Sequence, residues 1–123
     1  MGIDFTKALG THPDALKLRA ERTKVLASNI ANESTPGYQA RDFDFAASLR
    51  HTQTDDMTGM SLDTGDGDTN LKYRVPFHAA QDGNSVELGV EQATFSQNAS
   101  DFQTSLTFLN MKLKGLARAI EGQ

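Results

Sequence analysis

The residue types that most often perform chemistry are present in this chain, but their spacing forms no recognisable site. No two of the three histidines, His12, His51 and His78, are four residues apart, the spacing that would place both on one face of a helix. Serine and aspartate are numerous, yet there is neither a Gly-x-Ser-x-Gly elbow nor a Gly-x-x-x-x-Gly-Lys phosphate loop. Cysteine is absent, which excludes disulfides, thiol nucleophiles and cysteine zinc sites. We therefore expect no enzyme activity, no cofactor and no bound metal.

An acidic stretch offers the one candidate for a metal ligand set. Five aspartates and no basic residue lie between Asp55 and Asp68. The segment 66–70, Asp-Gly-Asp-Thr-Asn, places oxygen ligands at alternate residues, as calcium loops do. An EF-hand loop that began at Asp66 would need glycine and glutamate where the chain has Leu71 and Phe77. The match fails, and a solvated loop is the favoured interpretation.

The composition indicates one water-soluble domain. A length of 123 residues suits a single core, and 37% of the residues are hydrophobic without any run long enough to span a bilayer. The first seven residues lack a positive segment followed by an apolar one, so we expect no cleaved secretory signal. The net charge of −4 argues against a nucleic-acid partner.

The clearest periodic signal predicts a long helix over 85–121. Apolar residues recur there at alternating steps of three and four, which is typical of a helix that packs along a seam against a partner. Asn84 and Glu87 resemble an N-capping box at its start. Thirty-five residues at about 1.5 Å each would span roughly 50 Å, so we expect an elongated fold. The seam residues are Leu88, Phe95, Ala99, Phe102, Leu106, Leu109, Leu113, Leu116 and Ile120, with the polar Gln92 counted between the first two.

A second helix, predicted over 14–33, repeats this pattern through Leu16, Ala20, Thr23, Ala27 and Ile30. Both helices also carry apolar residues away from the seam. A helix with two apolar stripes needs a second partner, here another copy or another protein, although single exposed apolar residues are also common. The residues off the seam are Leu18 and Val25 in the first helix and Phe108 and Met111 in the second.

The segment 34–84 between the helices is predicted to be irregular. Pro36 and Gly37 suit the central positions of a type II turn that runs from Thr35 to Tyr38. Residues 41–49 are expected to begin extended and then form one or two helical turns, with Asp42 or Asp44 as the cap. Residues 53–70 are predicted to be a mobile loop, and 71–75 a short strand stopped by Pro76. The expected fold is mainly α, with the terminal helices packed as an antiparallel, coiled-coil-like pair.

The stretch 27–38, Ala-Ser-Asn-Ile-Ala-Asn-Glu-Ser-Thr-Pro-Gly-Tyr, resembles the N-terminal signature of the flagellar rod, hook and hook-associated axial proteins. That signature runs approximately Ala-x-Asn-(Ile/Leu)-Ala-Asn-x-x-Thr-Pro-Gly-Tyr. The segments 18–22, 38–45, 73–76, 82–86 and 113–115 resemble the proximal rod members of the family. The resemblance covers most of residues 14–120 except 53–70.

This resemblance implies a single rod-type domain over 1–123, in a structural subunit of the proximal rod of the bacterial flagellar basal body. It implies export through the flagellar type III apparatus without a cleaved signal, and helical self-assembly in the periplasm. Implied partners are other copies of the chain, neighbouring rod proteins of the FlgC and FlgF types, the adaptor FliE and the export gate. The alternatives are a sibling rod subunit of the FlgC type and a free helical protein-binding module.

The resemblance also implies an assembly role for the signature residues. Their polar side chains suit buried bonds between subunits, and the turn fixes how the chain leaves the helix. The alternative is that they only end the helix within one subunit. The expected subunit-interface residues are Leu16, Leu18, Val25, Asn29, Ile30, Asn32, Thr35, Pro36, Gly37, Tyr38, Phe95, Phe102, Leu106, Phe108, Leu109, Leu113, Leu116 and Ile120.

Overall fold

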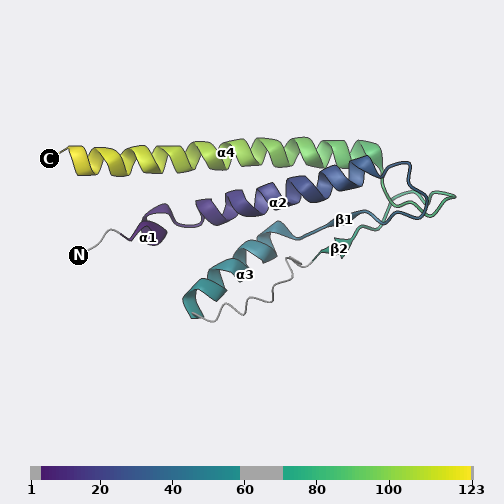
Figure 1. Cartoon of the computed structure of the whole chain (residues 1–123), viewed down its shortest axis with the longest axis horizontal. Coiled ribbons are helices and arrows are strands. Elements are labelled where there is room, and N and C mark those ends of the chain that lie inside the picture. The colour runs from purple at the N-terminus through teal and green to yellow at the C-terminus, as the bar shows by residue number, and fades with distance from the viewer. Residues whose placement is uncertain (1–3, 59–70, 123) are drawn as a thin grey trace.

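A computed structural model of the chain describes residues 4–58 and 71–122. The fold is mainly helical and elongated (Figure 1), with both termini at one end and loops at the other. The N-terminal helix α2 runs antiparallel to the long C-terminal helix α4, as the sequence predicts. None of the described helices is long and apolar enough to cross a membrane. The elements are α1 (Phe5–Leu9), α2 (His12–Ala31), β1 (Arg41–Asp42), α3 (Phe45–Thr58), β2 (Lys72–Tyr73) and α4 (Leu88–Glu121).

The helix α2 begins two residues earlier than predicted. Pro13 lies in its first turn, where a missing N–H costs nothing, and Asp14 in the same turn suits the positive end of the helix dipole. A short helix that the sequence analysis did not predict, α1, precedes it and packs against α4.

The start of α4 corrects the predicted capping box. The helix begins at Leu88, and its N-cap Glu87 makes no side-chain capping bond. Asn84 is buried, and its Nδ2 donates to the carbonyl oxygens of Asn32, Glu33 and Thr35 at 2.7–3.0 Å. Asn84 therefore joins the loop before α4 to the backbone just beyond the C-terminal end of α2.

The predicted turn after α2 is confirmed. The Tyr38 N–H donates to the Thr35 carbonyl at 3.2 Å, and Gly37 has a φ of +72°, as a type II turn requires. The Gly37 N–H donates to the Asp82 carbonyl at 2.9 Å. The turn is thereby joined to the loop that precedes α4.

The middle segment contains more regular structure than predicted. The strands β1 and β2 pair antiparallel, with Arg41 opposite Tyr73, so a strand forms within the predicted range 71–75. The helix α3 is capped by Asp44, whose Oδ1 accepts from the N–H groups of Ala46 and Ala47 at 3.1 and 3.3 Å.

The predicted loop 53–70 was wrong at its beginning. The helix α3 is 14 residues long and continues to Thr58. Once a helix is nucleated, each further residue adds a backbone bond, so a polar composition alone does not end it. Residues 59–70, which include the candidate calcium segment 66–70, lie outside the described residues.

The core is small and contains polar as well as apolar residues. Its buried apolar residues are Ala15, Leu18, Leu26, Ala40 and Phe43. The buried polar residues are Asn29, Ser48, Asn84, Ser85, Glu91 and Asn98. Buried polar groups stabilise a fold only when they are hydrogen-bonded, so these pairings decide how the elements fit together.

Candidate assembly surface and polar core

A polar stripe and the apolar seam run side by side along α4, and they have different roles within the chain. Glu91 and Asn98, seven residues apart, are 0% and 1% exposed and face the rest of the chain. The predicted seam lies beside this polar stripe. Its residues Phe95 and Phe102 are half-buried, and Leu113 and Ile120 are 42% and 60% exposed. The apolar seam of α4 is therefore only partly covered by its own chain.

On α2, too, the seam is only partly covered while residues outside the seam are buried. Its seam residues Leu16, Thr23 and Ile30 are half-buried, whereas Leu18 is 7% exposed. The sequence pattern places Leu18 on an outer stripe for a second molecule, but the side chain belongs to the core of this chain. The other residue of that stripe, Val25, is half-buried.

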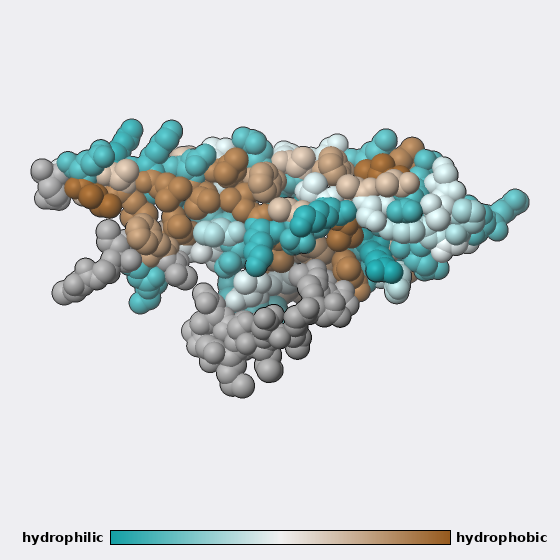
Figure 2. Space-filling model, viewed as in Figure 1, coloured by the Kyte–Doolittle hydropathy of each residue, from teal (hydrophilic) through white to brown (hydrophobic). Residues whose placement is uncertain are grey.

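The two seams meet in an apolar groove of about 460 Å³, lined by Ala20 and Thr23 of α2 and Ala99, Phe102 and Gln103 of α4. Figure 2 shows a continuous apolar band that runs along α4. Leu106, Leu109 and Leu116 are half-buried along the same seam.

The second apolar stripe of α4 is exposed near α1. Phe108 is 50% exposed and stacks on His12, with ring centroids 5.9 Å apart. Met111 is 61% exposed. His12 thus packs against an aromatic ring instead of joining another histidine.

The signature asparagines make their bonds inside the subunit. Asn29 is wholly buried, and its side-chain amide pairs with the backbone of Arg41 as a neighbouring strand would. Its Nδ2 donates to the Arg41 carbonyl at 2.6 Å, and its Oδ1 accepts from the Arg41 N–H at 3.0 Å. Asn29 therefore fixes β1 against α2, and its polar bonds are internal rather than between subunits.

Asn32, Thr35 and Tyr38 complete the end of α2. The Asn32 Nδ2 donates to the Ser28 carbonyl at 2.7 Å, and the Thr35 hydroxyl donates to Asn32 Oδ1 at 3.1 Å. The Tyr38 hydroxyl lies 3.2 Å from Ser28 Oγ and donates to Asn29 Oδ1 at 3.4 Å. Thr35, Pro36 and Gly37 are exposed. These bonds end the helix within one chain and leave the turn itself at the surface.

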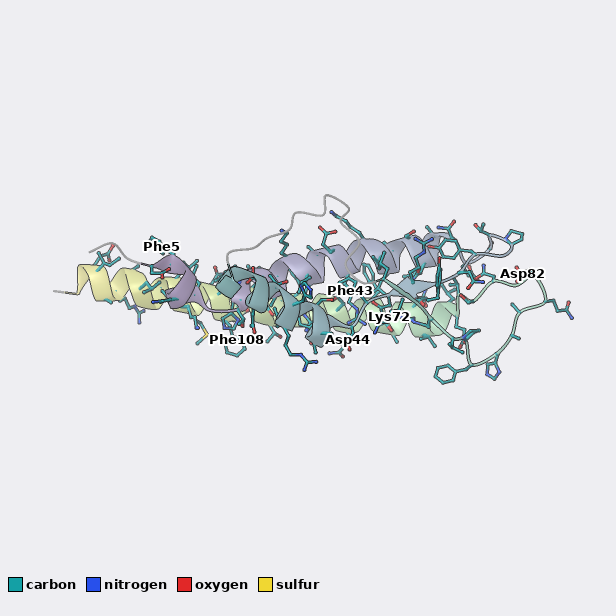
Figure 3. All side chains as sticks on the ribbon, turned by 90° about the horizontal axis from the view of Figure 1, so that it is seen from below. Phe5, Phe43, Asp44, Lys72, Asp82 and Phe108 are labelled. Atoms are coloured by element: carbon teal, nitrogen blue, oxygen red, sulfur yellow. The ribbon has the colours of Figure 1, made fainter. Side chains whose placement is uncertain are left out.

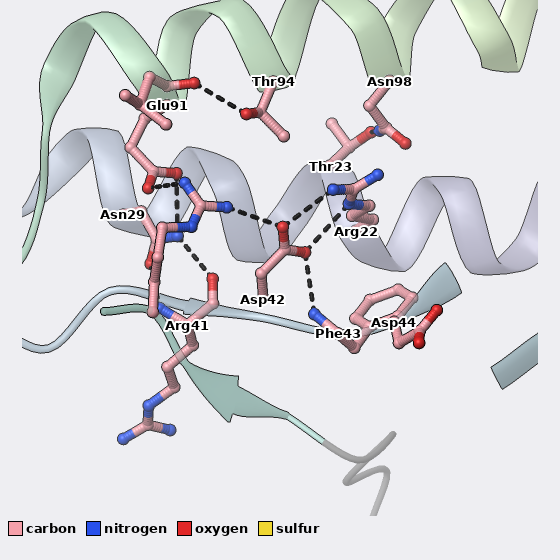
Figure 4. A network of polar contacts seen from close by, with 12 residues as sticks. Arg22, Thr23, Asn29, Arg41, Asp42, Phe43, Asp44, Glu91, Thr94 and Asn98 are labelled. Carbon is pink, nitrogen blue, oxygen red and sulfur yellow. Dashed lines mark hydrogen bonds and ion pairs between the residues drawn. The ribbon is translucent and has the colours of Figure 1, made fainter. Parts of the chain in front are cut away.

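A charged network joins α2, the β ribbon and α4 (Figure 4). Arg22 donates to both carboxylate oxygens of Asp42, through Nε at 3.0 Å and Nη2 at 2.9 Å. Arg74 donates to Asp42 Oδ2 at 2.7 Å and forms a second ion pair with Glu91. The Asn29 Nδ2 donates to the other carboxylate oxygen of Glu91 at 3.1 Å. Elements far apart in sequence are thus held in one register by bonds that have defined directions.

The network changes the titration of Asp42. Burial by itself would raise its pKa, but the hydrogen bond and charge of Arg22, the Phe43 N–H and the charge of Arg74 outweigh burial and lower the pKa. In turn, the hydrogen bond to Asp42 raises the pKa of Arg22. Asp42 therefore stays ionised throughout the neutral range and remains available to both arginines.

Sequence reasoning missed this network, although one signal was available. Glu91 and Asn98 stand seven residues apart in a helix with a seven-residue apolar seam, which indicates a polar stripe parallel to it. Asn98 donates to the Arg19 carbonyl at 3.1 Å and to Thr23 Oγ1 at 2.9 Å, so it does join α4 to α2. The partners of Glu91 are Arg74, directly after β2, and Asn29 of α2, and the periodicity of α4 does not locate them.

The two half-covered helices present features that are suited to packing. Within residues 4–58 and 71–122, no group of three or more histidine and acidic side chains could hold a metal ion. The charged groups of the network are satisfied by one another. Part of the apolar surface along the two seams remains accessible, with Leu113 and Ile120 42% and 60% exposed.

The chain is similar in sequence to proteins of the flagellar basal body rod. A family model described as "Flagella basal body rod protein" matches residues 9–39. The flagellar basal body rod protein FlgB of Aeromonas hydrophila is 38% identical over 131 residues, which cover 100% of this chain and 99% of the relative. FlgB of Cereibacter sphaeroides (strain ATCC 17029 / ATH 2.4.9) is 40% identical, with 97% of this chain and 98% of the relative covered. FlgB of Salmonella typhimurium strain LT2 is 37% identical, with 94% of each covered. With these identities over nearly the full length, the chain belongs to the FlgB family of flagellar basal body rod proteins.

Proposed function

We propose that this chain is a subunit of the proximal rod, where copies assemble helically in the periplasm and join the export gate and its adaptor to the rest of the rod. Membership of the family makes it a structural protein of the basal body rod. We further propose that it is exported by the flagellar type III apparatus without a cleaved signal. Its partners in this proposal are FliE at the gate and rod proteins of the FlgC and FlgF types. The role is structural and not enzymatic.

The observation that carries the proposal is the apolar seam of α4, which its own chain covers only in part. Leu113 and Ile120 are 42% and 60% exposed, and the groove between the seams is open. Burying one leucine or isoleucine side chain contributes about 1.5–3 kcal/mol. Several such residues on every copy would stabilise a polymer, whereas in an isolated subunit they remain in contact with water.

The signature residues have an indirect part in this proposal. Asn29 and Asn32 act inside the subunit by fixing the end of α2 and the position of β1. They hold the two seams and the exposed turn in the arrangement that the next subunit meets.

The test is Leu113→Asp in the bacterium that carries this gene. Because Leu113 is already partly exposed, an aspartate there costs the isolated subunit little. In a polymer the same charge would be buried in an apolar contact, at a cost of several kcal/mol. We expect a folded, exported subunit that builds no rod and gives no swimming. Leu106→Asp, at a half-buried seam position, should give the same loss of rod.

The matched control is Ser100→Asp. Ser100 is exposed on α4 and lies about 120° around the helix from Leu106. It adds the same charge to the same helix away from the seam, so we expect normal swimming. Normal swimming of the Leu113→Asp strain would contradict the proposal.

A further inference from the structure

The two ends of the molecule carry opposite charge. At the loop end, residues 32–40 and 75–90 contain three carboxylates and no lysine or arginine. Two of them, Glu33 and Asp82, are exposed, and Glu87 is half-buried. Val75 and Phe77 at this end are 86% and 82% exposed. We call this surface, formed by Glu33, Val75, Phe77 and Asp82, the acidic tip.

The opposite end is basic. From residue 110 to residue 122, α4 carries Lys112, Lys114 and Arg118 against the single carboxylate of Glu121, and all of these residues are exposed. Leu113 and Ile120 lie among them, 42% and 60% exposed. We call the surface formed by Lys112, Leu113, Lys114, Arg118 and Ile120 the basic end.

The acidic tip and the basic end cannot meet within one chain. Figure 3 shows Asp82 in the loops at one end of the molecule and Phe5, in α1, at the other. The 34 residues of α4 separate the two ends by roughly 50 Å. Each surface combines exposed apolar side chains with charges of one sign, so each is complementary to the other surface and not to itself.

We propose that the acidic tip of one copy binds the basic end of a second copy, head to tail. A contact between two different surfaces of the same chain repeats without closing unless its rotation forms a ring, and it therefore builds a helical filament. Val75 and Phe77 provide the apolar part of the contact and the charges set its direction. The inference rests on the proposed function, because it names the surfaces through which copies meet along the rod.

The test reverses the charge of each surface separately. Glu33→Lys with Gln81→Lys gives the tip two lysines against one exposed carboxylate, that of Asp82, which is left unchanged because it accepts a bond from the Asn84 N–H. Lys114→Glu with Arg118→Glu makes the basic end acidic. Each pair alters only exposed side chains, so circular dichroism of the purified variants should match that of the unaltered chain. We expect either pair alone to abolish swimming and all four substitutions together to restore it, since every tip then again faces an end of opposite charge.

The matched control is Lys24→Glu with Lys72→Glu. Both side chains are exposed away from the two ends, and the pair changes the net charge by the same amount as the reversed basic end. We expect normal swimming of this strain.

The outcomes separate this inference from the proposed function. Normal swimming of both reversed variants would overturn the head-to-tail contact, while the Leu113→Asp result would still decide whether the chain builds rod. Loss of swimming that the fourfold variant does not restore would also overturn it, because the tip would then bind a different protein. Restoration by the fourfold variant, with a normal control, would establish that copies meet through these two ends.

Discussion

Arg74, the residue directly after β2, forms an ion pair with Glu91, a wholly buried residue of α4. The same guanidinium donates to Asp42 on β1 at 2.7 Å, and Asp42 accepts two bonds from Arg22 on α2. The β ribbon is therefore held to both long helices by charges that depend on one another. A buried ion pair of this kind gives register more than net stability, but the loss of one partner leaves the other buried and unpaired.

We expect Glu91→Ala to lower the free energy of unfolding by about 3 kcal/mol, because it leaves Arg74 without a buried partner and opens a cavity. Glu91→Gln should cost about half as much, since the amide keeps the volume and one acceptor. Urea denaturation followed by circular dichroism measures both. Glu21→Gln, at a surface pair with Lys24, is the control, with an expected change under about 0.5 kcal/mol. A Glu91→Ala variant as stable as this control would contradict the role given to the network.

The lowered pKa of Asp42 predicts a pH dependence with a defined sign. A carboxylate whose pKa is lower in the folded state binds fewer protons there, so its contribution to stability is complete above its ordinary pKa of about 4. That contribution is lost as the pH falls from about 4 through the lowered value. At pH 7 we expect Asp42→Asn to be less stable than the unaltered chain by about 1–3 kcal/mol. The difference should shrink steadily below about pH 4. A difference that stays constant from pH 7 to pH 3 would show that ionisation of Asp42 does not matter.

Helical periodicity gave the parts of this fold that depend on residues close in sequence. The antiparallel helix pair, the elongated shape and the turn at Pro36–Gly37 follow from seam spacing and turn chemistry, and the structure agrees with them. These features depend on local backbone preferences and on which side chains share a helix face.

The same periodicity could not say which face turns inward. The buried residues of the two long helices are Ala15, Leu18, Leu26, Asn29, Glu91 and Asn98, and three of these six are polar. Apolar spacing identifies the seam, yet here the seam is only partly covered and the polar stripe is buried. The partners of Glu91 lie 17 and 62 residues away in the sequence, and the carbonyls bound by the Asn84 side chain lie 49 to 52 residues away. Such long-range hydrogen bonds leave no periodic signal. The length of α3 was underestimated, because the polar composition of its second half gave no sign that the helix continues to Thr58.

Amide exchange should divide α4 into two parts in the purified subunit. Glu91 and Asn98 anchor its first half, whereas Leu109 and Leu116 are the most covered residues between 107 and 122, and both are only half-buried. Local opening is easiest where few contacts are buried, so residues 110–121 should exchange fast and residues 91–105 more slowly. In assembled rod the second half should become protected. Equal protection of both halves in a subunit shown to be monomeric would mean that α4 needs no partner.

Gly37 provides a test of the turn that is separate from steric crowding. Its φ is +72°, and a Cβ added there would meet no atom within 4 Å, so the cost of a side chain is torsional. Left-handed backbone costs most residues about 1–2 kcal/mol, more with β-branching and less for asparagine. We therefore expect Gly37→Val to lower the free energy of unfolding by about 2 kcal/mol and Gly37→Asn by under about 1 kcal/mol. Swimming should be lost with valine and partly kept with asparagine, because the turn directs the segment that follows α2 in every copy.

Gly89 is the control for this prediction, because it also has open space around its Cα but lies inside α4. There Gly89→Ala should stabilise the chain by about 0.5–1 kcal/mol, since alanine is the better helix former. The opposite signs at two uncrowded glycines would assign the effect at Gly37 to its positive φ. Equal stability of Gly37→Val and Gly37→Asn would show instead that the turn relaxes to another conformation. Degradation of the valine variant before export would place its defect in folding, and the exported amount should be measured beside swimming for that reason.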